Sequence, residues 1–292
     1  MSSVTLFSPA KVNLFLAITD RREDGFHNLF SLVAPLDWGD TLHAKLAEET
    51  HLTCDDDSLP VDGSNLVMKA LAAFREATGW TTGVDLRLEK LIPMGAGLGG
   101  GSSNAVATLR ALNALSGNLL ADDQLTKIAR KLGADCALFL QNAPVVMRGI
   151  GDQVETLDEV SRKRISGRSI LLFKPPFGVS TPWAYGQMAA NPETYLSAKQ
   201  AEARWEGWQM NESESLADFG YNSMESVVFS KYPALPALYG LLRERFGLSP
   251  LMSGSGSASL VNLEKDTPIE EVTALIREMW GDAAFMTTAA LA

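Results

Sequence analysis

Residues 92–106 read IPMGAGLGGGSSNAV and join a proline to a run of small and hydroxylic residues that leads into an apolar pattern. Glycine lets the backbone approach another group closely, and five glycines lie between positions 95 and 101. Each costs about 1 kcal/mol of ordering relative to alanine, which argues for a functional reason. Backbone N–H groups that open a helix favour an anion. The stretch therefore predicts a phosphate-binding loop from Gly95 to Ser103.

Two other phosphate motifs do not fit this loop. Residues 95–100 satisfy G-x-G-x-x-G, but the strand before them carries three charges, and the acids at the right distance, Asp122 and Asp123, open a helix. A dinucleotide-binding domain needs a buried parallel strand and an acid at the end of the next strand. A P-loop needs Gly-Lys-Ser/Thr, which is missing. From the residues alone, a tight turn capped by Ser102 or Ser103 stays open.

The composition is that of an ordinary globular protein, with 292 residues, 46% apolar and 21% charged. The length favours two lobes. A formal net charge of −10 repels nucleic acid and anionic lipid, so we expect neither as a partner. Cys54 and Cys136 are too few for a disulfide framework and lack metal-ligand spacing. The start has no signal-peptide pattern, and we expect a cytoplasmic protein that is a monomer or weak homodimer.

Hydrophobic periodicity predicts an α+β fold, because the clearest strand alternates like an antiparallel strand with one solvated face. The first predicted strand alternates only partly, and Val12, Leu14, Leu16 and Ile18 are expected on one face of it. We expect a domain boundary within the polar segment 155–169, and a helical or mobile insert at 189–218. The predicted strands are 11–19, 83–91 and 169–175, and the predicted helices are 64–79 (between Ser64 or Asn65 and Gly79), 104–115, 125–132 (ended by Gly133) and 233–247.

The glycine-rich stretch resembles the second motif of the superfamily of galactokinase, homoserine kinase, mevalonate kinase and phosphomevalonate kinase. The segment SPAKVNLFLAITDRREDGFHNLFSLVAPLDWGDTL, residues 8–42, narrows the resemblance to the 4-diphosphocytidyl-2-C-methyl-D-erythritol kinases. NLVMKA, LGADCALFL, GIGDQVETL, VSTPWAY and MSGSGSASLV follow in that family's order. The resemblance spans nearly the whole chain.

The resemblance implies a two-lobed fold of the superfamily. Residues 1–158 would form an ATP-binding lobe that is ribosomal-protein-S5-like, residues 159–292 an α/β-sandwich lobe, and the substrate would bind between the lobes. The implied reaction is ATP- and Mg²⁺-dependent phosphorylation of the 2-hydroxyl of 4-diphosphocytidyl-2-C-methyl-D-erythritol, in non-mevalonate isoprenoid biosynthesis. The substrate is a small CDP-linked molecule, and no side chain is assigned to the metal.

The resemblance also implies roles for individual residues. Phosphoryl transfer needs positioning, charge stabilisation and a group that takes the proton of the attacking hydroxyl. Asp135, in LGAD, would be the base, and Lys11 the charge stabiliser. ATP would contact Asn65, Pro93, Gly95, Ala96, Gly97, Leu98, Gly99, Gly100, Gly101, Ser102 and Ser103. The substrate would contact Asn13, Phe26, His27, Thr181 and Tyr185, with cytosine held by His27 between the rings of Phe26 and Tyr185.

Two positions depart from the family pattern, and both bear on metal placement. Asn104 follows the two serines where the family usually has Asp, and Ser223 replaces the acid of an Asn-Asp pair. Without the resemblance, Asp135 would be interpreted as a cap or turn residue, and Lys11 as a solvated charge. Two alternatives stay open: a kinase of the homoserine or mevalonate type, and a catalytically impaired nucleotide-binding relative.

Overall fold

A computed structural model describes residues 2–213 and 215–292 and comprises two compact units. Unit 1 contains Met1–Ala10, Trp38–Pro93 and Gly99–Asn142; unit 2 contains Lys11–Asp37, Met94–Leu98 and Ala143–Ala292. The units are interleaved along the chain, because two long strands and the glycine-rich segment contribute residues to both. The predicted division into lobes at residues 158 and 159 stays a prediction.

Helices and strands are mixed along the whole chain, which confirms the α+β class. The strands are β1 (Ser3–Arg21), β2 (His27–Ala47), β3 (His51–Cys54), β4 (Gly83–Glu89), β5 (Val145–Arg148), β6 (Gln153–Thr156), β7 (Ser169–Lys174), β8 (Tyr221–Asn222), β9 (Leu251–Met252), β10 (Ser259–Asn262) and β11 (Phe285–Ala290). The α-helices are α1 (Leu66–Thr78), α2 (Gly100–Leu115), α3 (Asp122–Leu132), α4 (Glu159–Ile165), α5 (Thr181–Ala190), α6 (Ala198–Met210), α7 (Leu216–Phe219), α8 (Glu225–Lys231), α9 (Ala234–Phe246) and α10 (Ile269–Trp280), and the 3₁₀ helices are η1 (Ala134–Leu140) and η2 (Pro192–Thr194).

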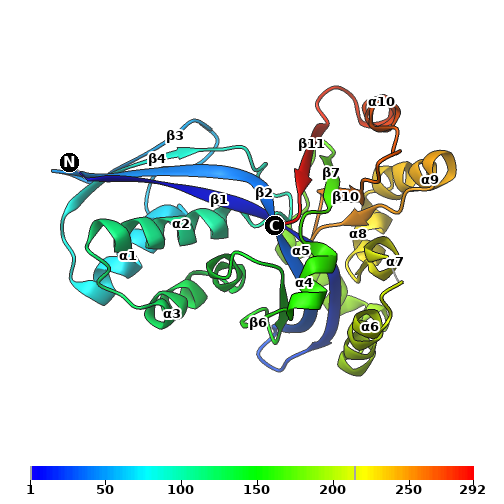
Figure 1. Ribbon diagram of the computed structural model, residues 1–292, viewed down its shortest axis with the longest axis horizontal. Helices are drawn as coiled ribbons and strands as arrows, with labels where there is room; N and C mark the ends of the chain where they lie inside the picture. Colours follow the sequence, from blue (N-terminus) through cyan, green and yellow to red (C-terminus); the bar gives the residue numbers. More distant parts are fainter. Residues whose placement is uncertain (1, 214) are drawn as a thin grey trace. The chain divides into compact units, whose positions relative to one another are not determined.

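Unit 1 is a sheet covered on one face by α1, α2 and α3 (Figure 1). β4 pairs antiparallel with β2 and parallel with β3. Val84, Leu86 and Leu88 are buried beneath the helices, whereas Asp85 and Arg87 are exposed. The predicted alternating strand with one solvated face is confirmed.

The ends of α1 and α3 agree with the caps predicted from sequence. Asn65 accepts a hydrogen bond from the Val67 N–H at the start of α1, and Gly79, with φ of 71°, follows its end. Asp122 opens α3, and Gly133 follows its last residue. Such ends are set by local backbone and side-chain groups, which explains why the sequence predicts them.

The start of α2 differs from the prediction. The helix begins at Gly100 instead of Asn104, because Gly99 takes φ of 72° and occupies the N-cap position. Ser102 and Ser103 therefore lie in the first turn, and the interpretation of either serine as the cap is wrong. The N-terminal N–H groups of the helix accordingly lie inside the glycine-rich stretch.

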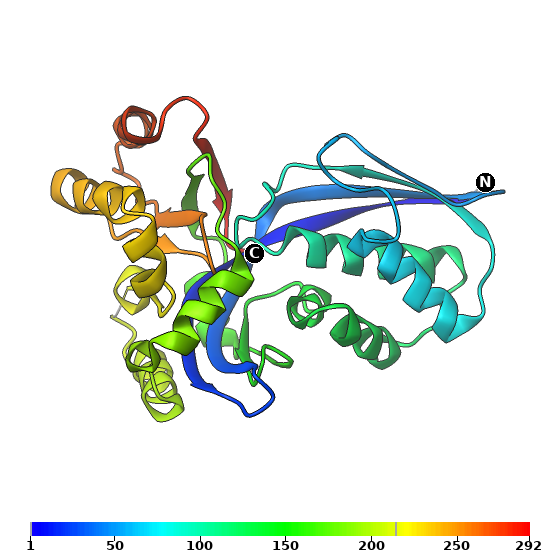
Figure 2. The ribbon, with the colours of Figure 1, turned by 180° about the vertical axis from the view of Figure 1, so that it is seen from behind.

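Unit 2 is built on the antiparallel sheet β11-β7-β10-β9. Its apolar core joins Phe173 of β7 and Val261 of β10 to α8, α9 and α10. Figure 2 shows these helices on one side of the sheet. The predicted helix 233–247 is confirmed as α9, with Gly247 at φ of 66° after its end.

The four residues predicted to share one face of β1, Val12, Leu14, Leu16 and Ile18, are all buried, and the other face of the strand is buried as well. Phe15 and Ala17 are as fully buried as Val12 and Ile18, so the middle of the strand is covered on both faces. Phe15 stacks on Phe219 at a ring-centroid distance of 4.9 Å. The second face of β1 is covered by residues such as Phe219, about 200 positions further along the chain. A local sequence pattern cannot predict such a distant contact.

The segment 189–218, expected to be a helical or mobile insert, is helical and contains η2, α6 and the start of α7. Its described part packs through the buried Trp205 and Trp208. Residue 214 lies outside the described residues. The segment 155–169 contains α4, capped by Asp158, whose side chain accepts from the Ser161 N–H at 2.9 Å.

Candidate active site

The glycine-rich loop contains three left-handed glycines: Gly95, Gly97 and Gly99, with φ of 60°, 77° and 72°. A Cβ on Gly97 would lie 2.2 Å from the Ser253 carbonyl oxygen, whereas one on Gly95 would meet nothing within 4 Å. Gly97 is therefore required both by its conformation and by close backbone packing, and Gly95 by its conformation alone.

The partner of Gly97 is the turn at 253–257, which belongs to SGSGSAS. Ser253 Oγ donates to the Gly97 carbonyl at 3.1 Å and accepts from the Asn13 N–H at 3.2 Å. Asn222 Nδ2 donates to the carbonyls of Met252 and Gly254 at 2.7 and 2.8 Å. These hydrogen bonds hold the turn against both the glycine loop and β1.

Lys11 and Asn13 lie on β1 beside this turn, with 4% and 7% of their surface exposed. Lys11 Nζ donates to Asn13 Oδ1 at 2.6 Å, and Asn13 Nδ2 donates to Ser31 Oγ at 2.8 Å. A Cβ on Gly254 would lie 3.4 Å from Lys11 Nζ. The interpretation of Lys11 as a solvated charge is wrong: it is a buried ammonium held in one position by its neighbour.

The predicted cytosine site in unit 2 centres on His27, which is 8% exposed at the start of β2. Its Nε2 lies 3.0 Å from the Tyr195 hydroxyl, and its ring lies 5.3 Å from that of Tyr185, tilted by 36°. Phe26 is 60% exposed. Burial, reinforced by Arg21, lowers the pKa of His27, so the imidazole is neutral at pH 7.

Two residues change the predicted substrate site. Tyr195 was missed by the sequence reasoning, because it follows η2 and belongs to no motif; only the folded chain brings it to His27. Thr181 opens α5, and its hydroxyl lies 2.7 Å from Ser255 Oγ, so it contacts the glycine-serine turn.

Asp135 lies in unit 1, half-buried in the first turn of η1. The next residue, Cys136, is buried, and burial raises the pKa of its thiol to about 11 despite a hydrogen bond with Ser102. The thiol is therefore protonated and unreactive at neutral pH. The contact between Cys136 and Ser102 joins η1 to the first turn of α2, so Asp135 and the end of the glycine-rich stretch adjoin within this unit.

Below that first turn lies a buried polar network around Asp40, which is fully buried. Its carboxylate accepts from the N–H groups of Leu91 and Ile92, at 2.7 and 2.8 Å, and forms an ion pair with Lys90. Asn104 Nδ2 donates to the same carboxylate at 2.8 Å. The network fixes the backbone just before Pro93.

The side chains of Ser103 and Asn104 are turned into unit 1. Ser8 Oγ donates to Ser103 Oγ at 2.8 Å and accepts from Asn104 Nδ2 at 2.8 Å, while Asn104 Oδ1 accepts from Lys90 Nζ at 3.0 Å. The departure at position 104 thus serves an internal network. Ser223, the other departure, accepts from the Ile18 N–H at 3.0 Å.

Asn65 has its side chain engaged at the start of α1, where it caps Val67 and donates to the Pro60 carbonyl at 2.7 Å. Among the residues that the structure describes, no group of three or more His, Cys, Asp or Glu side chains could hold a metal ion. No helix in this part of the chain is long and apolar enough to cross a membrane.

Residues 65–149 match the family model of the GHMP kinases N terminal domain, and together with the fold this makes the chain a GHMP kinase, one of a set of ATP-dependent phosphotransferases. A crystal structure of 4-(cytidine 5'-diphospho)-2C-methyl-D-erythritol kinase is similar at a TM-score of 0.78 and 35% identity, over 99% of this chain and 100% of that one. The 4-diphosphocytidyl-2-C-methyl-D-erythritol kinase of Prosthecochloris aestuarii is 35% identical over 98% of this chain and 99% of its own. That of Protochlamydia amoebophila is 36% identical over 88% and 84%. This chain belongs to the 4-diphosphocytidyl-2-C-methyl-D-erythritol kinase family.

Proposed function

We propose that the protein transfers the γ-phosphoryl group of ATP to the 2-hydroxyl of 4-diphosphocytidyl-2-C-methyl-D-erythritol, a step of non-mevalonate isoprenoid biosynthesis. The observation that carries this proposal is the similarity to kinases of that name along nearly the entire chain. It is supported within unit 2 by a neutral, buried His27 beside an aromatic ring, because a neutral imidazole can complement the hydrogen-bonding edge of cytosine.

The chemistry is assigned to Asp135 and Lys11. As the substrate oxygen bonds to the γ-phosphorus, its proton passes to the Asp135 carboxylate, and the bond between the γ-phosphorus and the bridging oxygen breaks to release ADP. The Lys11 ammonium offsets charge on the transferring group. Burial strengthens that effect, and the hydrogen bond to Asn13 keeps the ammonium in place.

ATP phosphates would bind the backbone of the glycine-rich loop and the first turn of α2, where unpaired N–H groups and the helix dipole favour negative charge. Ser102 adds a hydroxyl donor there, while the inward-facing Ser103 would contribute through its backbone. We assign Asn65, Pro93 and the segment from Gly95 to Ser103 to this role. The left-handed glycines support it, since a side chain would obstruct the backbone.

Mg²⁺ fits the site as part of the Mg–ATP substrate. A magnesium ion in kinases keeps several waters and binds substrate phosphates with one or two carboxylates. Among the described residues no group of three or more His, Cys, Asp or Glu side chains could hold the ion by itself, so it would bind mainly through the phosphates and water. The ion supplies charge neutralisation on the phosphates when bound.

The substrate contacts would be Asn13, Phe26, His27, Thr181 and Tyr185. On the basis of the net charge of −10, we further propose that the protein binds neither nucleic acid nor anionic membranes. We also propose that it is a monomer or weak homodimer in the cytoplasm.

The deciding experiment measures ADP release with 4-diphosphocytidyl-2-C-methyl-D-erythritol, homoserine and mevalonate as separate acceptors. We expect turnover with the first only. Turnover with another acceptor would replace the substrate assignment, and nucleotide binding without turnover on any of the three would favour an impaired relative.

A further inference from the structure

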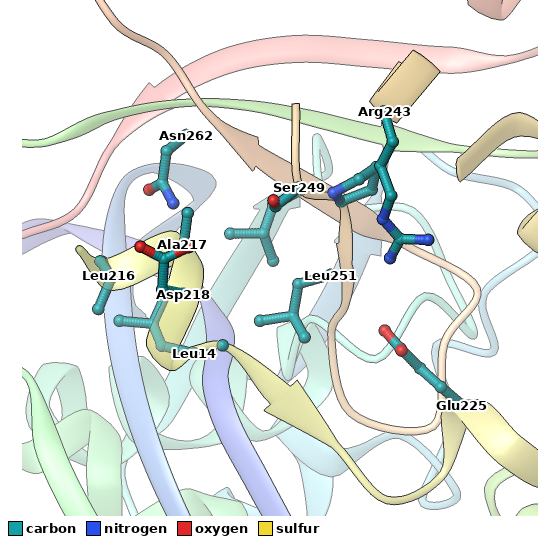
Figure 3. Close-up of a pocket in the computed structure, with 12 residues that line it drawn as sticks. Leu14, Leu216, Ala217, Asp218, Glu225, Arg243, Ser249, Leu251 and Asn262 are labelled. Atoms are coloured by element: carbon teal, nitrogen blue, oxygen red, sulfur yellow. The ribbon is translucent and has the colours of Figure 1, made fainter. Parts of the chain in front are cut away.

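Unit 2 contains a cavity of about 280 Å³ that the proposed reaction does not use (Figure 3). It lies among α7, the start of α8, α9 and the segment 249–251. The polar side chains that line it are Asp218, Glu225, Arg243, Ser249 and Asn262, and its apolar wall includes Leu14 and Leu251. We infer that this cavity is a regulatory binding site for a small carboxylic acid that also carries a hydroxyl or amino group.

One end of the cavity suits a carboxylate. In Figure 3 the Arg243 guanidinium points toward Glu225. The Arg243 side chain is exposed to solvent and lies over the Tyr239 ring, 5.9 Å from the ring centroid. A guanidinium binds a carboxylate through two parallel hydrogen bonds. Burial raises the pKa of Glu225 to about 7, so near neutral pH this side chain is often protonated and can donate to the same ligand.

The other end requires a donor. Asn262 Oδ1 is buried and has no hydrogen-bond partner among the described residues. A buried acceptor without a partner is energetically unfavourable, and a ligand hydroxyl or amine would supply the missing hydrogen bond. At roughly 30 Å³ for each water, the cavity has the volume of about nine waters, enough for a short organic acid between the two ends.

The cavity wall leads directly to the proposed catalytic lysine. Glu225 Oε1 accepts from the Met252 N–H at 2.8 Å. The turn at 253–257 follows directly, and a Cβ on Gly254 in this turn would lie 3.4 Å from Lys11 Nζ. Asn222 clamps the carbonyls of Met252 and Gly254. A ligand that engages Glu225 therefore acts on the segment packed against Lys11, and this contact route is why we assign a regulatory role.

Binding is tested by ligand-observed NMR on the full chain, with L-serine and D-glycerate as probes. Propionate is a control that lacks a hydroxyl or amino donor, and glycerol is a control that lacks the carboxylate. Arg243→Ala should weaken probe binding about tenfold or more, the effect of losing a bidentate charged hydrogen bond. Arg245→Ala, an exposed change on the same helix outside the cavity lining, should leave it unchanged. Equal binding by Arg243→Ala and wild type, or no binding of either probe at 50 mM, would overturn the site.

Regulation is tested by adding a bound probe to the ADP-release assay at saturating substrates. We expect kcat to change about twofold or more in the wild type and not in Arg243→Ala, with an unchanged KM for ATP. Binding without any change in kcat would overturn the regulatory role. The NMR arm needs no kinase activity, so it stands or fails independently of the proposed function.

Discussion

Asn104 Nδ2 lies 2.8 Å from Asp40 Oδ2, so an amide donates to a fully buried carboxylate that already pairs with Lys90. Asn104 Oδ1 accepts from Lys90 at the same time. The Asn104 amide thus donates from Nδ2 to the Asp40 carboxylate and accepts at Oδ1 from the Lys90 ammonium. A carboxylate at position 104 has no donor and could not make the first of these hydrogen bonds. The side chain at position 104 is therefore held by this internal network.

Asn104→Asp is therefore expected to destabilise the protein. It places a second carboxylate against Asp40 with one ammonium between them, and an uncompensated buried charge costs about 3–5 kcal/mol. Urea unfolding should show the loss, while the Mg²⁺ concentration for half-maximal activity of the folded fraction stays unchanged. A stable variant with a lower Mg²⁺ requirement would show that position 104 serves the metal after all.

The matched control is the exchange Asp40→Asn with Asn104→Asp in one chain. The amide at position 40 can accept from the Leu91 and Ile92 N–H groups and donate to the new acid, which pairs with Lys90. The double variant should recover at least half of the stability lost by Asn104→Asp alone. Simple addition of the two single losses would contradict the proposed network.

Asp135→Asn should lower kcat about 10²–10⁴-fold with little change in the KM for ATP, because the amide keeps the shape but cannot take the substrate proton. Steady-state kinetics check this. Lys11→Ala should also reduce kcat more than it raises the KM for ATP. Turnover of Asp135→Asn near that of the wild type would mean that the carboxylate only opens η1.

Gly97→Ala should abolish most activity and lower Tm, whereas Gly95→Ala should be milder. Both positions have positive φ, which costs about 1–2 kcal/mol for a residue with a Cβ. Only the Cβ at position 97 would also overlap the Ser253 carbonyl, at 2.2 Å. The two Tm values and the KM for ATP of each variant provide the comparison. Equal effects at both positions would contradict a specific contact between the loop and the turn.

The ends of α1 and α3 could be predicted from sequence, because Asn65, Gly79 and Gly133 act on their own neighbours. The network could not, since Asp40 and Asn104 are 64 positions apart and neither belongs to a pattern that reports the other. Lys11 shows the same limit: a lysine in a strand is usually solvated, and only the fold surrounds it with Asn13 and the turn at Gly254.

Stability should depend on Glu225 between about pH 4.5 and 7. Burial raises the pKa of its carboxyl from 4.5 to about 7. The Met252 N–H and Arg243 oppose this shift, because both favour the charged form. The Tyr239 hydroxyl also interacts with this carboxyl, and burial together with the Glu225 charge raises the pKa of Tyr239. In this window the unfolded chain has lost the proton that the folded chain keeps, so stability falls as pH rises, by about 3 kcal/mol in total.

Glu225→Gln removes that proton exchange and keeps the acceptor for Met252. Its free energy of unfolding, relative to the wild type, should therefore increase steadily from pH 4.5 to 7.5 in urea titrations. Glu244→Gln, an exposed change on α9, should run parallel to the wild type. A constant difference between Glu225→Gln and wild type across the range would show that the carboxyl does not titrate in this window.

The base site gives the sharpest test of the substrate assignment. Cytosine presents two acceptors and one amino donor, and uracil exchanges a donor and an acceptor at the same edge. Stacking on Tyr185 or Phe26 is worth about 1–3 kcal/mol and does not distinguish the bases, so discrimination must come from His27 and nearby backbone. CMP should therefore compete with the substrate much better than UMP.

His27→Ala should lower kcat/KM about 5- to 150-fold, the effect of losing a buried hydrogen-bond partner, and should bring the inhibition constants of CMP and UMP together. Tyr195→Phe keeps the ring but frees His27 Nε2, which lies 3.0 Å from the hydroxyl, so kcat/KM should fall about 2- to 12-fold with a smaller loss of CMP preference. Phe26→Tyr is the control and should be nearly silent, because it retains the exposed ring. Equal inhibition of the wild type by CMP and UMP, or an unchanged kcat/KM in His27→Ala, would remove cytosine from this site and leave its aromatic side chains without an assigned ligand.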